Sequence, residues 1–120
     1  MSHKKSKIYS LGFDLAIRVE EVCQNLPGHE KYSLAQQLRR ASRSVVANYV
    51  EAFVRQRSFP KDHQRFITYS QGSCDETKFW LEFAAATGLA SKEIAGDLLE
   101  GYAEVGKLLH HLFRRSPSKL

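Results

Sequence analysis

The side chains that could carry chemistry are concentrated in residues 33–57, which hold five arginines and a single acid, Glu51. A cluster of cations of this kind could bind the phosphates of RNA or DNA. Placed on an α-helix at about 100° per residue, the polar residues of this segment form a narrow stripe beside an apolar face. The stripe consists of Gln37, Arg40, Ser44, Asn48, Glu51 and Arg55.

This polar stripe has more than one interpretation. Asn48 and Glu51 lie in the middle of the helix beside an apolar seam, and asparagine is a mediocre helix former. The stripe could be a hydrogen-bonded network, linked at i, i+3 and i, i+4 spacing, that fixes the register of the helices or a subunit contact. It could instead be a polar groove that binds a ligand or nucleic acid, or a face that is simply exposed to solvent.

The chain contains no recognisable catalytic or metal-binding motif. No Ser/His/Asp or Cys/His arrangement stands out. His110 and His111 are adjacent, so on a helix they point about 100° apart, whereas a helical di-histidine metal site uses i, i+4 spacing. Di-iron bundles use Glu-x-x-His pairs, and the sequence has none. We therefore expect no enzymatic activity, no cofactor and no metal ion.

Positive charge is distributed unevenly along the chain, whose net charge is +5. Residues 1–10, 31–65 and 106–120 carry net charges of +3, +6 and +4, whereas 11–30 and 66–105 are net negative. Such a surface suits a polyanion, although it could also merely aid solubility. The residues expected to contact phosphate are Arg39, Arg40, Arg43, Arg55, Arg57, Lys61, Lys4, Lys5, Lys7, Arg114 and Arg115.

Four segments show the i, i+3/i+4 apolar period of helices, and no strand pattern competes with them. They span residues 8–25, 33–56, 60–87 and 91–115. Ser33 and Ser91 are candidate N-caps, and Gly88-Leu89 is typical of a helix end. The short links favour neighbouring antiparallel helices. We predict a single all-α domain over residues 1–120, an antiparallel up-down-up-down four-helix bundle with mobile tails at 1–7 and 116–120.

A cytoplasmic location is expected. No window approaches 18 uninterrupted apolar residues, so no membrane span is predicted, and no secretory apolar region follows the basic N-terminus. Cys23 and Cys74 lie far apart and form no pair motif. We expect both to be buried thiols that behave as small hydrophobic side chains.

Self-association is predicted from apolar residues that the core does not need. The second helix loses its polar surface towards its C-terminal end, which indicates that a neighbouring subunit covers it. Leu81 points inward, so Phe79 and Phe83 should point outward and form a contact patch. Base stacking on these rings is the alternative, which the neighbouring acids disfavour. The expected interface residues are Val50, Val54, Phe79, Trp80 and Phe83.

A longer motif extends from the first link into the third helix. It comprises Glu30-Lys31-Tyr32, Leu34, Gln37-Leu38-Arg39-Arg40-Ala41, Ser44-Val45, Asn48 and Glu51, then Gly72-Ser73, Glu76, Leu81 and Gly88-Leu89. Over roughly residues 11–113 the chain resembles the small four-helix-bundle proteins first noticed as open reading frames in intervening sequences of large-subunit ribosomal RNA genes. Val46 and Ala52 stand where that family has proline and glycine, so we expect a straighter second helix.

The resemblance implies a homo-oligomer, a ring of five. The family's fold relatives include accessory proteins of diversity-generating retroelements, which bind nucleic acid and a reverse transcriptase. Together with the basic segments, this favours a non-enzymatic, pentameric scaffold that binds nucleic acid, with RNA preferred over DNA. The alternative is a protein-protein interaction module, in which the polar stripe only stabilises the oligomer.

Overall fold

The computed structural model describes residues 2–116, and within them the chain is helical, with no strand. The α-helices are α1 (Lys7–Gln24), α2 (Leu34–Arg55), α3 (Pro60–Ala86) and α4 (Lys92–Arg114), and two short 3-10 helices are η1 (His3–Lys5) and η2 (Gly28–Glu30). The bounds of the α-helices lie within one residue of those expected from the sequence. The all-helical fold class with four α-helices in the described residues is confirmed.

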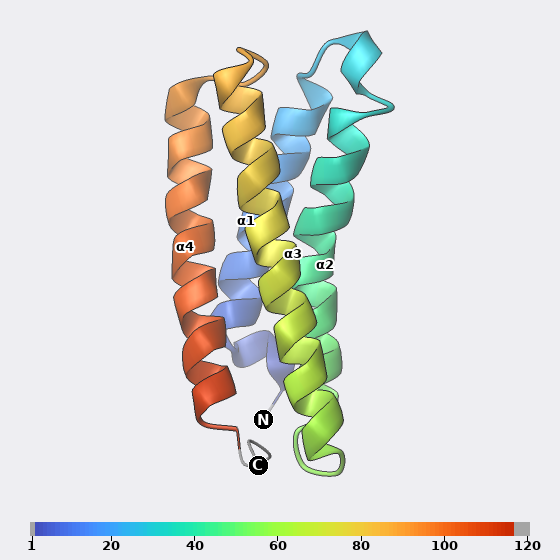
Figure 1. The fold of residues 1–120 in the computed structure, drawn as a ribbon, viewed down its shortest axis with the longest axis vertical. Coiled ribbons are helices and arrows are strands. Elements are labelled where there is room, and N and C mark those ends of the chain that lie inside the picture. Colours follow the sequence, from blue (N-terminus) through green and yellow to red (C-terminus); the bar gives the residue numbers. More distant parts are fainter. Residues whose placement is uncertain (1, 117–120) are drawn as a thin grey trace.

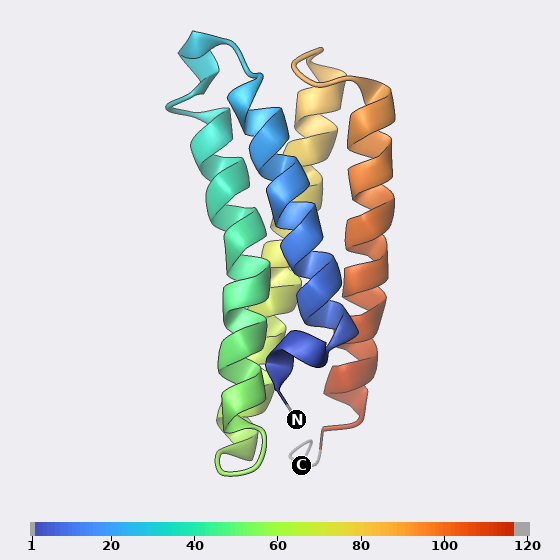
Figure 2. The same cartoon turned by 180° about the vertical axis from the view of Figure 1, so that it is seen from behind.

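The four helices lie side by side in a rod with extents of 45 × 25 × 23 Å (Figure 1). The helix α1 packs on α2 and α4, and α3 packs on the same two helices. The α1–α2 and α3–α4 links lie at one end of the rod (Figures 1 and 2). The α2–α3 link, η1 and the last turn of α4 lie at the other end. Among the described residues, no helix combines the length and apolarity that a bilayer crossing requires.

Two of the predicted helix starts have different capping chemistry. Ser91 accepts a hydrogen bond from the Ile94 amide at 3.1 Å, so it caps α4 as expected. Ser33 precedes α2 but does not cap it with its side chain, because its hydroxyl donates to Glu30 at 2.6 Å. Glu30 instead accepts from the Leu34 amide at 3.4 Å. The first turn of α2 is therefore capped by a carboxylate from η2.

The predicted stop at Gly88-Leu89 is confirmed. Gly88 has a φ of 75°, a conformation that glycine adopts without the steric cost of a Cβ atom. The Leu89 amide donates to the Ala84 carbonyl at 2.9 Å, and the Gly88 amide donates to the Ala85 carbonyl at 3.2 Å. These two bonds are those of a Schellman motif, which satisfies carbonyls at the end of α3.

Small side chains line the seam of α3 and bond to the backbones of its neighbours. The Ser70 hydroxyl donates to the Val45 carbonyl of α2 at 2.6 Å. The Cys74 thiol donates to the Tyr102 carbonyl of α4 at 3.2 Å. Both bonds are buried, and both require the backbones to approach closely. Cys23 and Cys74 are free and buried, as the sequence predicts.

The N-terminal residues belong to the folded bundle, which corrects the prediction of a mobile tail at 1–7. Lys7 is the first residue of α1, and η1 precedes it. The His3 ring lies 5.0 Å from the Tyr9 ring and 5.9 Å from the Phe53 ring, centroid to centroid. These contacts hold η1 against α1 and α2. Ser116 is buried, and residues 1 and 117–120 of the predicted tails lie outside the described residues.

Candidate nucleic-acid interface

Two of the arginines expected to contact phosphate are engaged by an acid of the same chain. Arg39 of α2 donates to both carboxylate oxygens of Glu20 in α1, through Nε at 2.8 Å and an Nη at 2.9 Å. Arg43 lies 3.4 Å from the same carboxylate. The hydrogen bond from Arg39 lowers the pKa of Glu20, against the opposing effect of desolvation. The face of α2 that holds these arginines is therefore partly neutralised.

Arg40 is also paired within the bundle. Its guanidinium donates to Gln37 at 2.8 Å and to the carboxylate of Glu76 in α3. The Trp80 indole donates to the same carboxylate at 3.0 Å. The hydrogen bonds from Arg40 and Trp80 lower the pKa of Glu76. Part of the predicted polar stripe thus forms a network that joins α2 to α3.

The C-terminal half of the stripe is built differently. Arg55 donates to the carboxylate and the carbonyl of Glu51, one turn before it on α2. Its guanidinium carbon lies 4.9 Å from the centroid of the Phe66 ring. Ser44 and Asn48 are half-buried between these two clusters, and their side chains make no hydrogen bond within residues 2–116. The stripe is therefore two separate clusters and not one continuous network.

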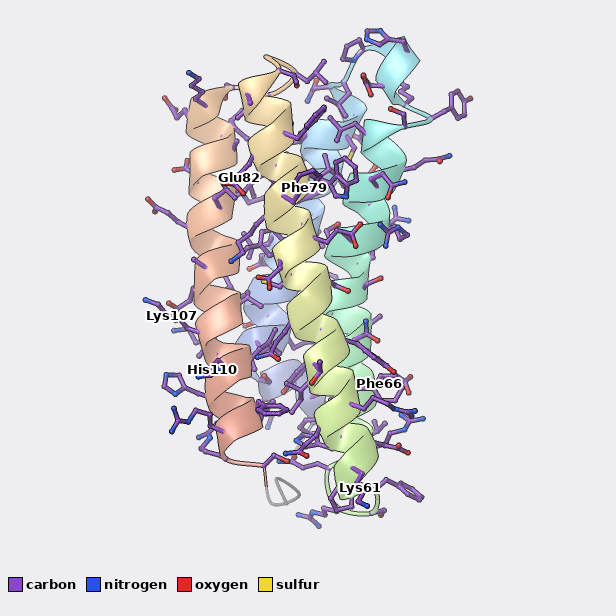
Figure 3. All side chains as sticks on the ribbon, in the orientation of Figure 1. Lys61, Phe66, Phe79, Glu82, Lys107 and His110 are labelled. Atoms are coloured by element: carbon purple, nitrogen blue, oxygen red, sulfur yellow. The ribbon has the colours of Figure 1, made fainter. Side chains whose placement is uncertain are left out.

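The remaining candidate cations gather at one end of the rod. This basic end is formed by η1, the α2–α3 link with the start of α3, and the last turn of α4 (Figures 1 and 3). Lys7 pairs with Glu104 at 3.7 Å. The others have no acidic partner within residues 2–116 and are exposed. They are Lys4, Lys5, Arg57, Lys61, Arg114 and Arg115.

The opposite end of the rod has more acidic than basic side chains. Lys31 and Lys92 lie there together with the acids Glu30, Glu82 and Glu93, and Figure 3 shows Glu82 far from Lys61. The bundle is therefore electrostatically polarised along its long axis, and an approaching polyanion is attracted to the basic end.

Sequence reasoning missed several residues of the same region. Lys107 and His110 project from the lower half of α4 in Figure 3, and both are exposed. With Arg114 they recur at i, i+3 and i+7, which is one face of a helix. This spacing is visible in the sequence and is the signal that identifies the face. Arg65 is the other missed cation, and it lies 3.1 Å from Asp62 on α3.

The predicted interface residues lie on two different sides of the bundle. On α2, Val54 is 61% exposed and Val50 lines a groove of about 460 Å³ between α1 and α2. On α3, Phe79 and Phe83 are exposed and Trp80 packs between them and the core. The α1 side of the groove was not predicted. The α1 residues that line this groove recur at i+3 and i+4, beside the residues of α1 that face the core. They are Tyr9, Phe13, Ala16 and Ile17.

No metal centre is formed within residues 2–116, where no three His, Cys, Asp or Glu side chains are close enough to share an ion. The rings of His110 and His111 lie 6.4 Å apart, centroid to centroid. His63 is buried, with Nδ1 at 2.7 Å from the Ala52 carbonyl, which links α3 to α2. This contact is that of a core histidine.

These features define a helical bundle protein of the four-helix class with one basic end. The chain belongs to the family described as 23S rRNA-intervening sequence proteins, whose family model matches residues 4–111. A similar solved structure is that of a protein with unknown function from the S23 ribosomal protein family of Bacteroides thetaiotaomicron. It is 22% identical, with a TM-score of 0.80 over 89% of this chain and 98% of that chain, which supports the fold. No curated protein matches the chain significantly.

Proposed function

We propose that this protein is a non-enzymatic, homo-oligomeric scaffold that binds nucleic acid, RNA in preference to DNA, through its basic end. The observation that carries the proposal is the convergence of unpaired cations from three segments at that end. Each of them is free to release the counterions of a phosphate backbone, which is the main source of affinity in such complexes. The assignment moves the contact surface away from Arg39, Arg40 and Arg43, whose charges are already used within the bundle.

The preference for RNA is supported by the family. Its description places these proteins with intervening sequences of 23S ribosomal RNA. A protein that works on ribosomal RNA would act in the cytoplasm, and the free buried cysteines fit a reducing compartment. The physical basis for RNA binding by this chain is the charge of its basic end.

The homo-oligomer, a ring of five, is proposed from two separate apolar surfaces. A closed ring uses head-to-tail contacts, which require two different patches on each subunit. The α1–α2 groove and the rings of Phe79 and Phe83 provide two such patches on different sides of the bundle. Every subunit of a ring has the same orientation to the axis, so five basic ends would act together. Clustered charge of this kind strengthens binding to a polyanion.

The alternative function is a protein-protein interaction module. It is favoured by the pairing of Arg40, a residue of the polar stripe, with Glu76 of α3, which supports a role of that stripe in joining helices. Under this alternative the apolar surfaces bind partners and the basic end aids solubility.

Fluorescence anisotropy with a labelled structured RNA, at two salt concentrations, separates the two functions. The test variant is Arg57→Gln with Lys61→Gln and Arg114→Gln, and the matched control is Arg39→Gln with Arg40→Gln and Arg43→Gln. We expect the test variant to weaken binding at least tenfold and to reduce the slope of log affinity against log salt by roughly one for each phosphate that is no longer neutralised. The control should retain most of the affinity.

Light scattering coupled to size exclusion is measured on the same samples. A particle of about five subunits that shifts with RNA only at low salt supports the proposal. Wild-type protein that ignores RNA at every salt concentration overturns it in favour of the protein-binding module. A monomer overturns the ring.

A further inference from the structure

Two aromatic rings beside the basic end are exposed without a structural reason. Phe59 is 58% exposed and Tyr69 is 47% exposed. The backbone of Phe59 is held firmly, because its amide donates to the Arg55 carbonyl at 2.9 Å and its carbonyl accepts from the His63 amide at 2.9 Å. Its side chain nevertheless points to solvent, where an apolar ring loses the free energy of burial. The chain therefore presents an exposed aromatic ring on a hydrogen-bonded backbone at the end of the α2–α3 link.

Tyr69 lies on α3, and Phe59 is the residue directly before the first turn of that helix, with φ −138° and ψ 72°. Residues 62, 66 and 69 follow the i, i+3/i+4 spacing of a single helix face. Ten residues separate Phe59 from Tyr69, a rise of about 15 Å. Phe66 lies between them, and its ring meets the Tyr69 ring edge to face at 5.5 Å. Phe59, Phe66 and Tyr69 form a short aromatic track that begins at the basic end and continues along α3.

Cations accompany this track along its length. The guanidinium carbons of Arg55 and Arg65 lie 4.9 and 5.2 Å from the Phe66 centroid. Arg57 and Lys61 flank Phe59 in the chain and are exposed. The track also contains two acids, since Glu51 pairs with Arg55 and Asp62 pairs with Arg65. Four cations against two carboxylates leave the track positive.

The other exposed phenylalanines have different surroundings. Phe79 and Phe83 lie on the same helix but beside Asp75, Glu76 and Glu82. Asp75 is largely exposed and pairs with Lys78 at 3.4 Å, and Glu76 pairs with Arg40, so the three acids there meet two cations. Phe13 lines the α1–α2 groove, where Arg43 pairs with Glu20. Cations without an acidic partner lie beside an exposed ring at the Phe59 track, in Arg57 and Lys61.

We propose that the track binds unpaired nucleotides of a single strand, with bases stacked on Phe59 and Tyr69 and phosphates bound by Arg57 and Lys61. A base stacks on an aromatic ring only when its face is free, so a duplex can use the cations but not the rings. The inference rests on the proposed function and deepens it, because it names the chemical state of the nucleic acid. The ligand is a single-stranded segment, without a requirement for base sequence.

The test compares a labelled 12-nucleotide oligouridine with a labelled RNA duplex of equal length, by fluorescence anisotropy. Replacing Phe59 and Tyr69 by alanine should weaken binding of the single strand roughly 5- to 150-fold for each base that no longer stacks on a ring. Binding of the duplex should change less than twofold. The slope of log affinity against log salt should stay the same, because no cation is removed.

Two further variants act as controls. Tyr32→Ala removes an exposed ring from the α1–α2 link, at the opposite end of the rod, and should leave both affinities unchanged. Phe59→Trp should retain binding of the single strand, and its added indole fluorescence should be quenched on stacking. Circular dichroism of each variant checks that the helical content is unchanged.

The outcomes distinguish this inference from the proposed function. If Phe59→Ala and Tyr69→Ala bind the oligouridine as the wild type does, the stacking track is wrong and electrostatic binding at the basic end stands. If the wild type binds duplex more tightly than single strand, the track is also wrong. If the wild type binds neither RNA, both proposals fail together.

Discussion

Arg39 of α2 and Glu20 of α1 form a two-pronged ion pair, with hydrogen bonds of 2.8 and 2.9 Å. The guanidinium group matches both oxygens of the carboxylate, which is the strongest geometry available to a surface ion pair. Both side chains are about one third exposed, so water and salt screen part of the interaction. The pair fixes how α1 and α2 are rotated against each other, and it removes Arg39 from the set of free cations.

The first prediction concerns the acid stability of the bundle. The folded state lowers the pKa of Glu20 below its ordinary value of 4.5, chiefly through the hydrogen bond from Arg39. A lowered folded pKa contributes stability that is complete above the unfolded pKa and is lost as pH falls through the folded pKa. We expect Glu20→Gln to lower Tm by about a few degrees at pH 7 and to have progressively less effect as pH falls below 4.5 and through the lowered pKa of Glu20, in thermal melts followed by circular dichroism.

Arg18→Gln is the matched control for this experiment, because Arg18 is exposed on α1 and has no acidic partner within residues 2–116. Its Tm should follow that of the wild type across the pH range. An equal loss for Glu20→Gln at pH 7 and at pH 3 would show that the variant removes packing and not charge pairing.

The second prediction concerns the close approach of α4 to α1 at Gly101. A Cβ atom at this position would meet the Leu15 side chain, with Cγ at 3.2 Å and Cδ2 closer still. Leu15 is buried, at 2% exposure, in the hydrophobic core. We expect Gly101→Ala to lower the free energy of unfolding by about 1–3 kcal/mol, measured by urea denaturation. Gly96→Ala on the same helix meets nothing within 4 Å and should instead stabilise by about 0.5–1 kcal/mol. The same sign for both variants would contradict the packing argument.

The helices were predictable because their apolar periods are regular and their ends carry local signals. Three of these signals are local. Ser91 caps the start of α4, Pro60 fixes φ at the start of α3, and Gly88 adopts a positive φ after the end of α3. Each depends only on residues that are close in the sequence. The same period predicts that Phe79 and Phe83 point to the surface of the bundle, because Leu81 points into its core. Ser33 was the exception, since Glu30 competes for its hydroxyl.

The candidate site was less predictable because it depends on contacts between helices. Glu20 and Arg39 are 19 residues apart, and only the rotation of α1 against α2 decides that they meet. The sequence does not give the rotation of α1 against α2, so it does not distinguish the paired arginines of α2 from the free ones. The basic end likewise arises from three separate segments, and only the fold brings the α2–α3 link, η1 and the last turn of α4 to the same end of the rod (Figures 1 and 3).

The third prediction concerns the two thiols. Burial raises the pKa of Cys23 and of Cys74 to about 11. A thiolate, not a thiol, attacks a disulfide reagent, so neither cysteine should react in the folded protein at pH 8. We expect no reaction with Ellman's reagent in buffer and two equivalents of thiol after denaturation in guanidinium chloride. Rapid reaction of one thiol in buffer would indicate that its helix opens locally, and amide hydrogen exchange would identify which one.

The fourth prediction concerns a buried hydroxyl. Tyr102 is fully buried on α4, and its hydroxyl has no hydrogen-bond partner within residues 2–116. Burial raises its pKa above the usual range. An unpaired buried hydroxyl costs free energy, so Tyr102→Phe should leave the stability to urea unchanged or raise it by up to about 1 kcal/mol. Ser70→Ala is the control, because the Ser70 hydroxyl donates to the Val45 carbonyl at 2.6 Å and its removal should lose about 1 kcal/mol. Equal losses for the two variants would mean that the Tyr102 hydroxyl has a partner, such as a buried water molecule.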